Sequence, residues 1–398
     1  MKPDQRRGEI DALRGMALFG VLLVNLYSFG ADSVAWEGGL DRFFWSLKHV
    51  VFESKFWGLF SLLFGIAFWM QTQKDGNVWR LSRRFATLLL IGLCHALLFE
   101  GDILMLYAEL GFCLLAFYRL PDRVLLPIAL ACLLVFPIAH GINPDRGGGD
   151  VAADLEEAHL WLQEDREASL YVSGSFWEIV TEHAHYLPEI PWEDYQWPDS
   201  GFAVLSFFLF GYIAARRGWV WRLTSAPKKA AQIGLMLGFV GLCLMIVERY
   251  LAHRWGFSVF GPSLEDPLHR LLGDGAYLLA TTLLTLAWFV LGLGTFVHYQ
   301  HLTWVKYLVD LGRLSLTVYL MQSLIFTTLF YGYGLGLAYE LGPAAVTALA
   351  MTVFAVQAVL ARCWLRYYAV GPAEWLWRYA TDLRPPTWRR PPDPMPIP

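Results

Sequence analysis

The stretch IDALRGMALFGVLLVNLYSFG, residues 10–30, decides the fold of this chain. Its apolar run is long enough to cross the hydrocarbon core of a bilayer, which takes about 20 residues. It nevertheless opens on Arg14 and carries Asn25 eleven residues further on. Because polar side chains are costly in lipid and usually face a protein interior or a water-filled pathway, this segment predicts a membrane helix that lines a functional site.

The composition of the whole chain agrees with a membrane protein. Of its 398 residues, 56% are hydrophobic, 16% are aromatic and only 17% are charged, which is far from the soluble average. The apolar segments are helical in length and lie along one continuous chain. We therefore expect an all-α, polytopic integral membrane protein that forms a single transmembrane domain over residues 1–398. The bilayer is its main partner, and nothing in the sequence points to nucleic acid.

Ten segments have the length and hydropathy of membrane spans. They cover residues 12–30, 54–71, 84–100, 103–120, 123–140, 200–216, 230–250, 274–297, 305–333 and 342–363. The connections between them alternate in charge, and basic residues gather on the cytoplasmic side of short loops. One set of connections and both termini are basic, including a loop with Lys74, Arg80, Arg83 and Arg84. We predict that both termini are cytoplasmic and that the chain lies in the cell membrane, as a bacterial inner-membrane protein.

The other connections are acidic and are predicted to face outward. The largest is the loop 141–199 between the fifth and sixth spans, which holds 14 acidic residues against only Arg146 and Arg166. At the other end of the chain, residues 381–398 form a proline-rich tail on the cytoplasmic side. The first span has an alternative interpretation as a cleaved signal peptide, since basic residues precede it. Its long apolar part and Asn25 argue against that.

Neither metal chemistry nor disulfide chemistry is indicated. The cysteines lie in or at the ends of apolar spans with no metal-binding or disulfide spacing, and they read as packing residues; they are Cys94, Cys113, Cys132, Cys243 and Cys363. His183 and His185 alone are too sparse for a metal site. The sequence therefore predicts no metal.

Five blocks resemble one known family. They are IDALRGMALFGVLLVN, KFWGLFSLLFGIAF, LLLIGLCHALLFEGDILMLYAELG, GRLSLTVYLMQSLIFTTLFYGYGLGL and WLRYYAVGPAEWLWR, and they lie in order between residue 6 and about residue 380. Together they resemble the YeiB family, also called domain of unknown function 418. That family is grouped with the acyltransferase-3 membrane enzymes and with heparan glucosaminide acetyltransferase. The resemblance implies a membrane-embedded acyltransferase that uses acyl-CoA, possible forms including acetyl-CoA, as donor.

This chain departs from those relatives at two positions. The acyltransferase-3 pattern has a catalytic histidine eleven residues after the arginine of the first span, where this chain has Asn25, as the heparan enzyme also has. The heparan enzyme places its histidine further along, at a spacing that Trp36 occupies here. In GRLSLTVYLMQ the residues Gly312, Arg313, Ser315 and Tyr319 match the acyltransferase-3 pattern, but Gln322 replaces a histidine. An amide holds a carbonyl or a hydroxyl, but it accepts no proton near neutral pH.

A base must then come from elsewhere, and His95 is the best-placed candidate. It lies about eleven residues into the third span, or ~17 Å at ~1.5 Å per residue, near the middle of a core of ~30 Å. Asn25 reaches the same depth and Gln322 a similar one. We expect these three side chains to line a central cavity; the alternative is that they only bond neighbouring helices. Asp102, after the turn at Gly101, either orients His95 or binds a basic acceptor at the cavity mouth; the alternative is that it caps the next helix.

Arginines gather at the cytoplasmic ends of the spans. Arg14 and Arg313 lie inside their spans, and Arg83 and Arg84 enter the third span. Guanidinium groups bind phosphate bidentately, and the resemblance adds Ser315 and Tyr319 to this donor site. Ordinary cytoplasmic anchoring is the alternative for Arg80.

The sequence thus predicts transfer of an acyl group from a cytosolic acyl-CoA to an extracytoplasmic hydroxyl or amine, in a small molecule or a glycan. His95 takes the acceptor proton, and Asn25 and Gln322 hold the acyl carbonyl. A transporter or exporter that uses the same polar layer is the main alternative, and a non-catalytic scaffold is a further one. Oligomerisation is open, with a homodimer as one possibility.

Overall fold

The computed structural model describes residues 8–29, 31, 36, 38–74, 76–142, 170–188, 201–255 and 267–390. Nearly all of these residues are helical. Over these ranges the chain forms no strand, and its one isolated β-bridge pairs Tyr368 with Arg389. The all-α prediction is confirmed.

The helices follow the apolar segments of the sequence closely. In chain order they are α1 (Gly8–Tyr27), α2 (Gly39–Leu47), the π-helix η1 (Lys48–Phe52), α3 (Lys55–Lys74), α4 (Val78–Ala96), α5 (Leu104–Phe117), α6 (Asp122–Ile142), α8 (Leu170–Ser173), α9 (Phe176–Tyr186), α11 (Gly201–Arg216), α12 (Trp219–Thr224), α13 (Pro227–Trp255), α14 (Pro267–His298), α15 (Thr303–Arg313), α16 (Ser315–Phe330), α17 (Pro343–Tyr367) and α18 (Pro372–Asp382).

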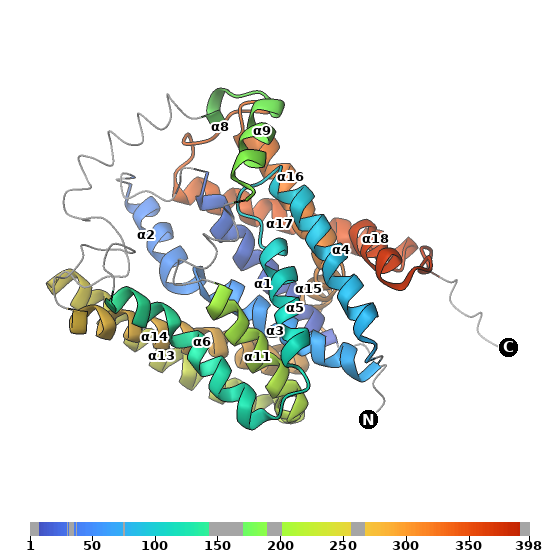
Figure 1. Ribbon diagram of the computed structural model, residues 1–398. Coiled ribbons are helices and arrows are strands. Elements are labelled where there is room, and N and C mark those ends of the chain that lie inside the picture. The colour runs from blue at the N-terminus through green and yellow to red at the C-terminus, as the bar shows by residue number, and fades with distance from the viewer. Residues whose placement is uncertain are drawn as a thin grey trace.

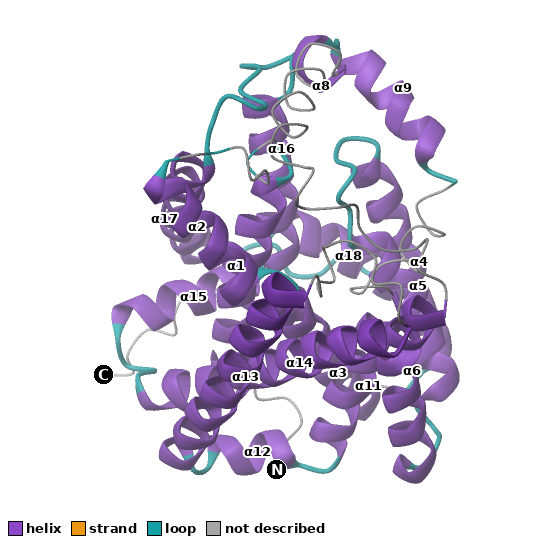
Figure 2. Ribbon diagram, turned by 90° about the vertical axis from the view of Figure 1, so that its left-hand side faces the viewer, coloured by secondary structure: helices purple, strands orange, loops and turns teal. Residues whose placement is uncertain are grey.

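The helices pack as one bundle with a peripheral helical hairpin. α1 packs against α3, α15 and α17, and α3 packs against α11. The hairpin α13–α14 lies at one side of this bundle, next to α6 (Figure 1). The short helices α8 and α9 lie at one end of the molecule and α12 at the other (Figure 2). Since α8 and α9 come from the acidic loop, the described residues 170–188 of that loop lie at one end of the bundle.

Glycines bring α1 and α15 into close contact. A Cβ atom on Gly15 would collide with the carbonyl oxygen of Leu308, and one on Gly312 would collide with the carbonyl oxygen of Asp11. Only residues without a side chain allow two helix backbones to approach this closely. The contact sets the neighbouring residues Arg14 and Arg313 beside the same cavity.

Five helical segments are long and apolar enough to cross a membrane, or six if the bent pair α15–α16 is one span, by length and composition over the described residues. All ten predicted segments coincide with helices, but several fall short of the criteria for a span. α5 and α11 have only 14 and 16 residues, and the arginines of α4 lower its hydropathy. The structure therefore supports a multi-pass membrane protein with five or six candidate spans.

The segment predicted as one long span, residues 305–333, is two helices that meet at 84°. The break lies at Leu314, and Glu374 of α18 stabilises it. Its Oε1 accepts from the backbone N–H groups of Leu316 and Thr317, at 2.8 and 3.1 Å. A continuous helix would satisfy these donors within itself, so the carboxylate replaces the missing turn.

The two remaining topological predictions fall partly outside the described residues. Within the loop 141–199, only residues 170–188 are described, and they include α8 and α9. Within the tail 381–398, residues up to 390 are described: Arg390 N–H donates to the Tyr367 carbonyl, which ties this segment to the end of α17. Residues 143–169, 189–200 and 391–398 lie outside the described part.

Candidate functional site

A cavity of about 480 Å³ opens between α1, α3, α4, α16 and α18. We call it the basic cavity, because six cationic side chains line it against two carboxylates. The cations are Arg14, Lys74, Arg80, Arg84, Arg313 and Arg378, and the carboxylates are Glu374 and Asp382. Glu374 is engaged by the start of α16, and Asp382 accepts from Arg80 Nε at 2.6 Å. The wall therefore keeps an excess of positive charge.

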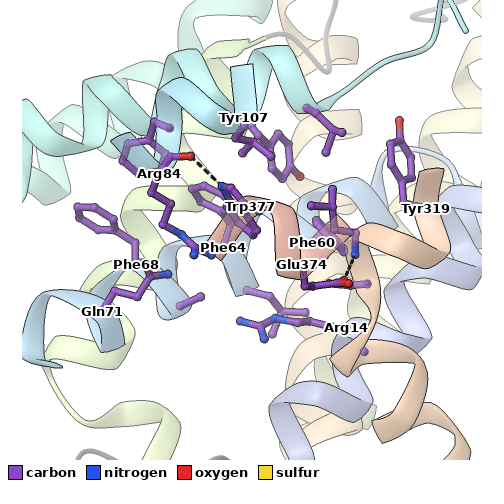
Figure 3. Close-up of a pocket in the computed structure, with 18 of the residues that line it drawn as sticks. Arg14, Phe60, Phe64, Phe68, Gln71, Arg84, Tyr107, Tyr319, Glu374 and Trp377 are labelled. Carbon is purple, nitrogen blue, oxygen red and sulfur yellow. Dashed lines mark hydrogen bonds between the residues drawn. The ribbon is translucent and has the colours of Figure 1, made fainter. Parts of the chain in front are cut away.

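The inner part of the basic cavity is apolar. Phe60, Phe64 and Phe68 of α3 face it, as Figure 3 shows, and Leu18 and Val21 of α1 complete the wall. A charged rim with an apolar interior fits a ligand that has an anionic end and an apolar end.

Arg84 and Trp377 form the best-defined contact of the rim. The Arg84 guanidinium lies 3.5 Å from the centroid of the Trp377 ring, and Trp377 Nε1 donates to the Arg84 carbonyl at 2.8 Å (Figure 3). This arrangement fixes the guanidinium plane at the cavity wall. Arg14 also lines the cavity and forms an ion pair with Asp11 at 3.2 Å.

The predicted donor residues do not all reach the basic cavity. Arg14, Arg84 and Arg313 line it, as do Ser315 and Tyr319. Arg83 is outside the wall, and its Nε donates to the Thr381 carbonyl of α18 at 3.0 Å. Arg83 therefore supports the position of α18, while the neighbouring Arg84 faces the cavity.

His95 and Asp102 form a buried pair. His95 is 3% exposed, and its Nδ1 lies 2.6 Å from Asp102 Oδ1. α4 ends at Ala96, and the turn that follows brings Asp102 back beside the histidine, as the sequence allowed. Asp102 Oδ2 also accepts from the Met105 backbone N–H at 2.8 Å at the start of α5. Asp102 therefore contacts both the histidine and the first turn of α5, although Ile103 is the N-cap residue of that helix.

The second nitrogen of the histidine is available. His95 Nε2 is buried and has no hydrogen-bond partner among the described residues. A carboxylate on Nδ1 holds the proton there and leaves Nε2 as the basic nitrogen. This is the arrangement of a histidine that acts as a general base.

A small cavity of about 20 Å³ lies next to this pair. Its wall includes Asn25, Phe99, Tyr319 and Gln322, and the rings of Phe99 and Tyr319 both contact the His95 ring, at centroid distances of 5.9 and 5.1 Å. A space of this size accommodates one water molecule. The two predicted amides therefore share a small cavity whose wall is mainly apolar, but His95 is not in that wall and only contacts the rings of Phe99 and Tyr319 that form part of it.

Gln322 is held by a second glutamine. Its Nε2 donates to Gln357 Oε1 at 3.0 Å, and its own Oε1 is buried without a partner in the described chain. Such a buried acceptor needs a donor from water or from a ligand. Gln322 thus offers an acceptor near the small cavity.

A third cavity, of about 780 Å³, lies on the other side of Asp102. We call it the aromatic cavity, because seven aromatic side chains line it: Phe29, Trp57, Phe99, Tyr171, Tyr186, Tyr331 and Tyr339. Its wall also contains the polar side chains of Asn25, Glu100 and Asp102. Ile103 belongs to the walls of both the aromatic and the basic cavity. Asn25 likewise belongs to the aromatic and the small cavity. Of the pair, only Asp102 lines a cavity, the aromatic one, while His95 is not in the wall of any of these three cavities.

Tyr171 of α8 links the acidic loop to this cavity. Its ring stacks on Tyr331 at 4.9 Å, and its hydroxyl donates to Glu100 Oε2 at 2.8 Å. Burial, and then the charge of Glu100, raise the pKa of Tyr171 above its ordinary value. The phenol thus stays protonated and remains a donor to the carboxylate.

Sequence reasoning missed the contribution of α18 and of α8. Trp377 and Glu374 belong to the block WLRYYAVGPAEWLWR, whose Gly371-Pro372 start is typical of a helix N-terminus, and this signal could have identified α18. Nothing near Tyr171 in the sequence indicated contact with residue 100. Long-range pairing of this kind depends on the packed structure.

Comparison with known proteins identifies the family. The chain is 32% identical to the uncharacterized protein YxaH of Bacillus subtilis over 96% of this chain and 95% of YxaH. It belongs to the YeiB family. Residues 214–384 match the family described as protein of unknown function (DUF418).

Other relatives support this membership. The chain is 27% identical to the uncharacterized protein YeiB of Escherichia coli, over 95% of the chain and 96% of YeiB. It is 24% identical to an uncharacterized 39.9 kDa protein from the amylase 3′ region of Bacillus acidopullulyticus, over 96% of the chain and 95% of that protein. No solved structure matches the chain.

Proposed function

We propose that this YeiB-family protein is a membrane-embedded acyltransferase that moves an acyl group from a cytosolic acyl-CoA to an extracytoplasmic hydroxyl or amine. One observation carries the proposal: the buried His95–Asp102 pair contacts the walls of both large cavities, because Asp102 lines the aromatic cavity and the His95 ring lies 5.1 Å from Tyr319 in the wall of the basic cavity. A reaction that joins two ligands from opposite sides needs such an arrangement.

The basic cavity fits the donor. Arginines of its wall supply charge-assisted contacts to the phosphates of an acyl-CoA, and the Arg84 guanidinium, stacked on the Trp377 ring, is held ready for such a contact. The apolar interior around Phe60 and Phe64 accommodates the thioester arm and the acyl group, with acetyl as the smallest case. No metal enters this proposal.

The polar residues near the small cavity fit the chemical step. His95 Nε2 accepts the proton of the acceptor group, and Asp102 stabilises the imidazolium that forms. The Asn25 amide would donate to the acyl carbonyl, and Gln322 Oε1, which has no partner in the described chain, would accept from the O–H or N–H of the acceptor. Tyr319 lies in the walls of the basic and small cavities; its hydroxyl donates to the Gly101 carbonyl at 3.4 Å and keeps an acceptor oxygen near the same point.

The proposal includes a topology. With ten spans and both termini cytoplasmic, the basic cavity opens to the cytoplasm and the aromatic cavity opens outward, in the inner membrane of a bacterium. Cysteine-accessibility labelling tests this directly. Positions 76–79 should label from the cytoplasm and positions 176–186 from outside; the reverse result would invert the assignment of both cavities.

A transporter is the second candidate, and the two cavities with the shared wall residue Ile103 favour it. Proteoliposomes separate the two functions. An acyltransferase given acyl-labelled acetyl-CoA and an acceptor releases free CoA thiol and labels the acceptor, whereas a transporter moves a solute without releasing thiol. Solute passage with no thiol release would replace the acyltransferase proposal.

A further inference from the structure

The aromatic cavity has a charge and a surface chemistry that neither family membership nor the donor site explains. Two carboxylates, Glu100 and Asp102, lie in its wall. In the described part of the chain, its wall contains no Lys, Arg or His. The cavity volume of about 780 Å³ is that of a small-molecule site.

The aromatic rings of the cavity are fixed by stacking on one another. Tyr331 stacks on Tyr171 at 4.9 Å with 25° between the planes, and Phe29 contacts Tyr331 at 5.4 Å and Phe99 at 5.9 Å. Fixed ring faces attract a cation that comes within about 6 Å of the ring centroid. Held rigid in this way, they lose little conformational entropy when a ligand binds.

The two carboxylates differ in what they leave for a ligand. Both oxygens of Asp102 accept internal hydrogen bonds, from His95 and from the Met105 backbone. Glu100 is exposed, and within the described residues only its Oε2 accepts a side-chain hydrogen bond, from Tyr171. Glu100 is therefore the charge that a ligand can contact, while Asp102 adds negative potential deeper in the wall.

We propose that the aromatic cavity binds an organic cation with a protonated primary amine, and that this amine is the acyl acceptor. The acceptor part rests on the proposed acyltransferase function; the cation-binding part does not. Glu100 holds the ammonium group in the part of the wall next to Asp102, and the aromatic faces hold its apolar body.

The amine must lose a proton before it can react. One ammonium proton passes to His95 Nε2, by way of a water in the small cavity, and frees the nitrogen lone pair. The nitrogen then forms a bond to the thioester carbonyl carbon, and the carbon–sulfur bond breaks. The second nitrogen proton goes to the departing thiolate. The products are an amide and CoA thiol, and His95 releases its proton to solvent.

A matched pair of probes tests the cation site without any acyl donor. Full-length protein in nanodiscs is titrated with benzylammonium and with benzyl alcohol, and binding is followed by Trp fluorescence and calorimetry at pH 7. We expect benzylammonium to bind at least about tenfold more tightly, from charge and cation–π attraction. Equal binding of the two probes would overturn the proposal.

Variants then test whether Glu100 is the carboxylate that contacts the cation. Glu100→Gln should remove the preference for the cation, whereas Glu182→Gln, which removes an acid of α9 outside the cavity wall, should leave it unchanged. Tyr171→Phe keeps the ring and releases Glu100 Oε2, so cation binding should be kept or strengthened even if Glu100→Gln folds poorly. A wild-type preference in folded Glu100→Gln, or its loss in Tyr171→Phe, would contradict the assignment.

The acceptor part has a separate readout. If cation binding is present but no labelled amide forms from acyl-labelled acetyl-CoA, the acyltransferase function fails and the cation site remains. If alcohols are acylated and amines are not, the acceptor assignment fails and the acyltransferase function remains.

Discussion

The basic cavity and the aromatic cavity share Ile103 in their walls but are opposite in charge and in the source of their residues. The basic cavity has six cations and takes its rim from α4 and α18, at the side predicted to be cytoplasmic. The aromatic cavity has two carboxylates and takes part of its wall from α8 and α9, which belong to the acidic loop. The same alternation of charge that predicts the topology therefore continues into the walls of the two cavities.

The largest expected effect is at the point between the two cavities. His95→Gln keeps a hydrogen-bonding side chain but cannot accept a proton, so turnover in the CoA-release assay should fall about 10²–10⁴-fold. Binding of acyl-CoA and of benzylammonium should both persist, because neither cavity loses a charge.

The control for this variant is His185→Gln, at an exposed position of α9. It should retain full turnover. Normal turnover in folded His95→Gln would show that the buried pair only joins the end of α4 to α5. The two cavities would then not be linked by a proton transfer through His95.

The next effect should fall on the basic cavity alone. Arg84→Ala removes a guanidinium from the Trp377 face, and charge-assisted contacts to phosphate are worth about 1.5–3 kcal/mol. Acetyl-CoA binding should weaken by about 10- to 150-fold, as measured by calorimetry, while benzylammonium binding stays the same.

Arg123→Ala is the matched control, since Arg123 is an exposed arginine at the start of α6 that lies outside the cavity wall. It should bind acetyl-CoA as the wild type does. Equal losses of acetyl-CoA affinity in both variants would show that the arginines act only through general surface charge. An unchanged affinity in Arg84→Ala would show that they only anchor the topology.

A smaller effect is expected where the aromatic and small cavities meet. Asn25→Ala removes one neutral hydrogen-bonding group, worth about 0.5–1.5 kcal/mol, so turnover should fall by about tenfold or less. The protein should be impaired but active. A complete loss, equal to that of His95→Gln, would place Asn25 in the proton-transfer step.

The smallest effect concerns the helix that covers the aromatic cavity. Ser175 caps α9: its Oγ accepts from the Glu178 backbone N–H, and Glu178 Oε2 accepts from the Ser175 backbone N–H at 2.8 Å. Ser175→Ala should destabilise α9 by about 1 kcal/mol. Hydrogen exchange of residues 176–186 should rise several-fold, with no change around the basic cavity.

This cap also has a defined pH dependence. Hydrogen bonds from Ser175 lower the pKa of the Glu178 carboxyl from its ordinary value. The cap therefore contributes above the unfolded pKa of Glu178 and is lost as the pH falls through the lower, folded pKa. In Ser175→Ala, exchange in α9 should depend less on pH over this acidic range; an unchanged dependence would show that the cap does not control α9.

Much of the fold was accessible from the sequence because its signals are local. Each of the ten apolar runs predicted as spans coincides with a helix or, for residues 305–333, with two helices, and the composition predicted a membrane protein. The bend at Leu314 was missed, since it depends on Glu374, a residue 60 positions away whose carboxylate caps α16. Hydropathy has no means of detecting such a partner.

The candidate site likewise has a part that the sequence predicted and a part that only the tertiary structure decided. The sequence by itself determined the candidate base, the two amides and the rim arginines, since each is an isolated polar residue in or beside an apolar run, where burial is costly. Only the tertiary structure decided that the turn after α4 brings Asp102 to His95, that Arg84 faces the cavity while Arg83 holds α18, and that Tyr171 reaches Glu100. These outcomes depend on helix rotation and on contacts between distant segments, because a hydrogen bond requires atoms within about 3 Å and residue spacing along the chain does not fix that distance.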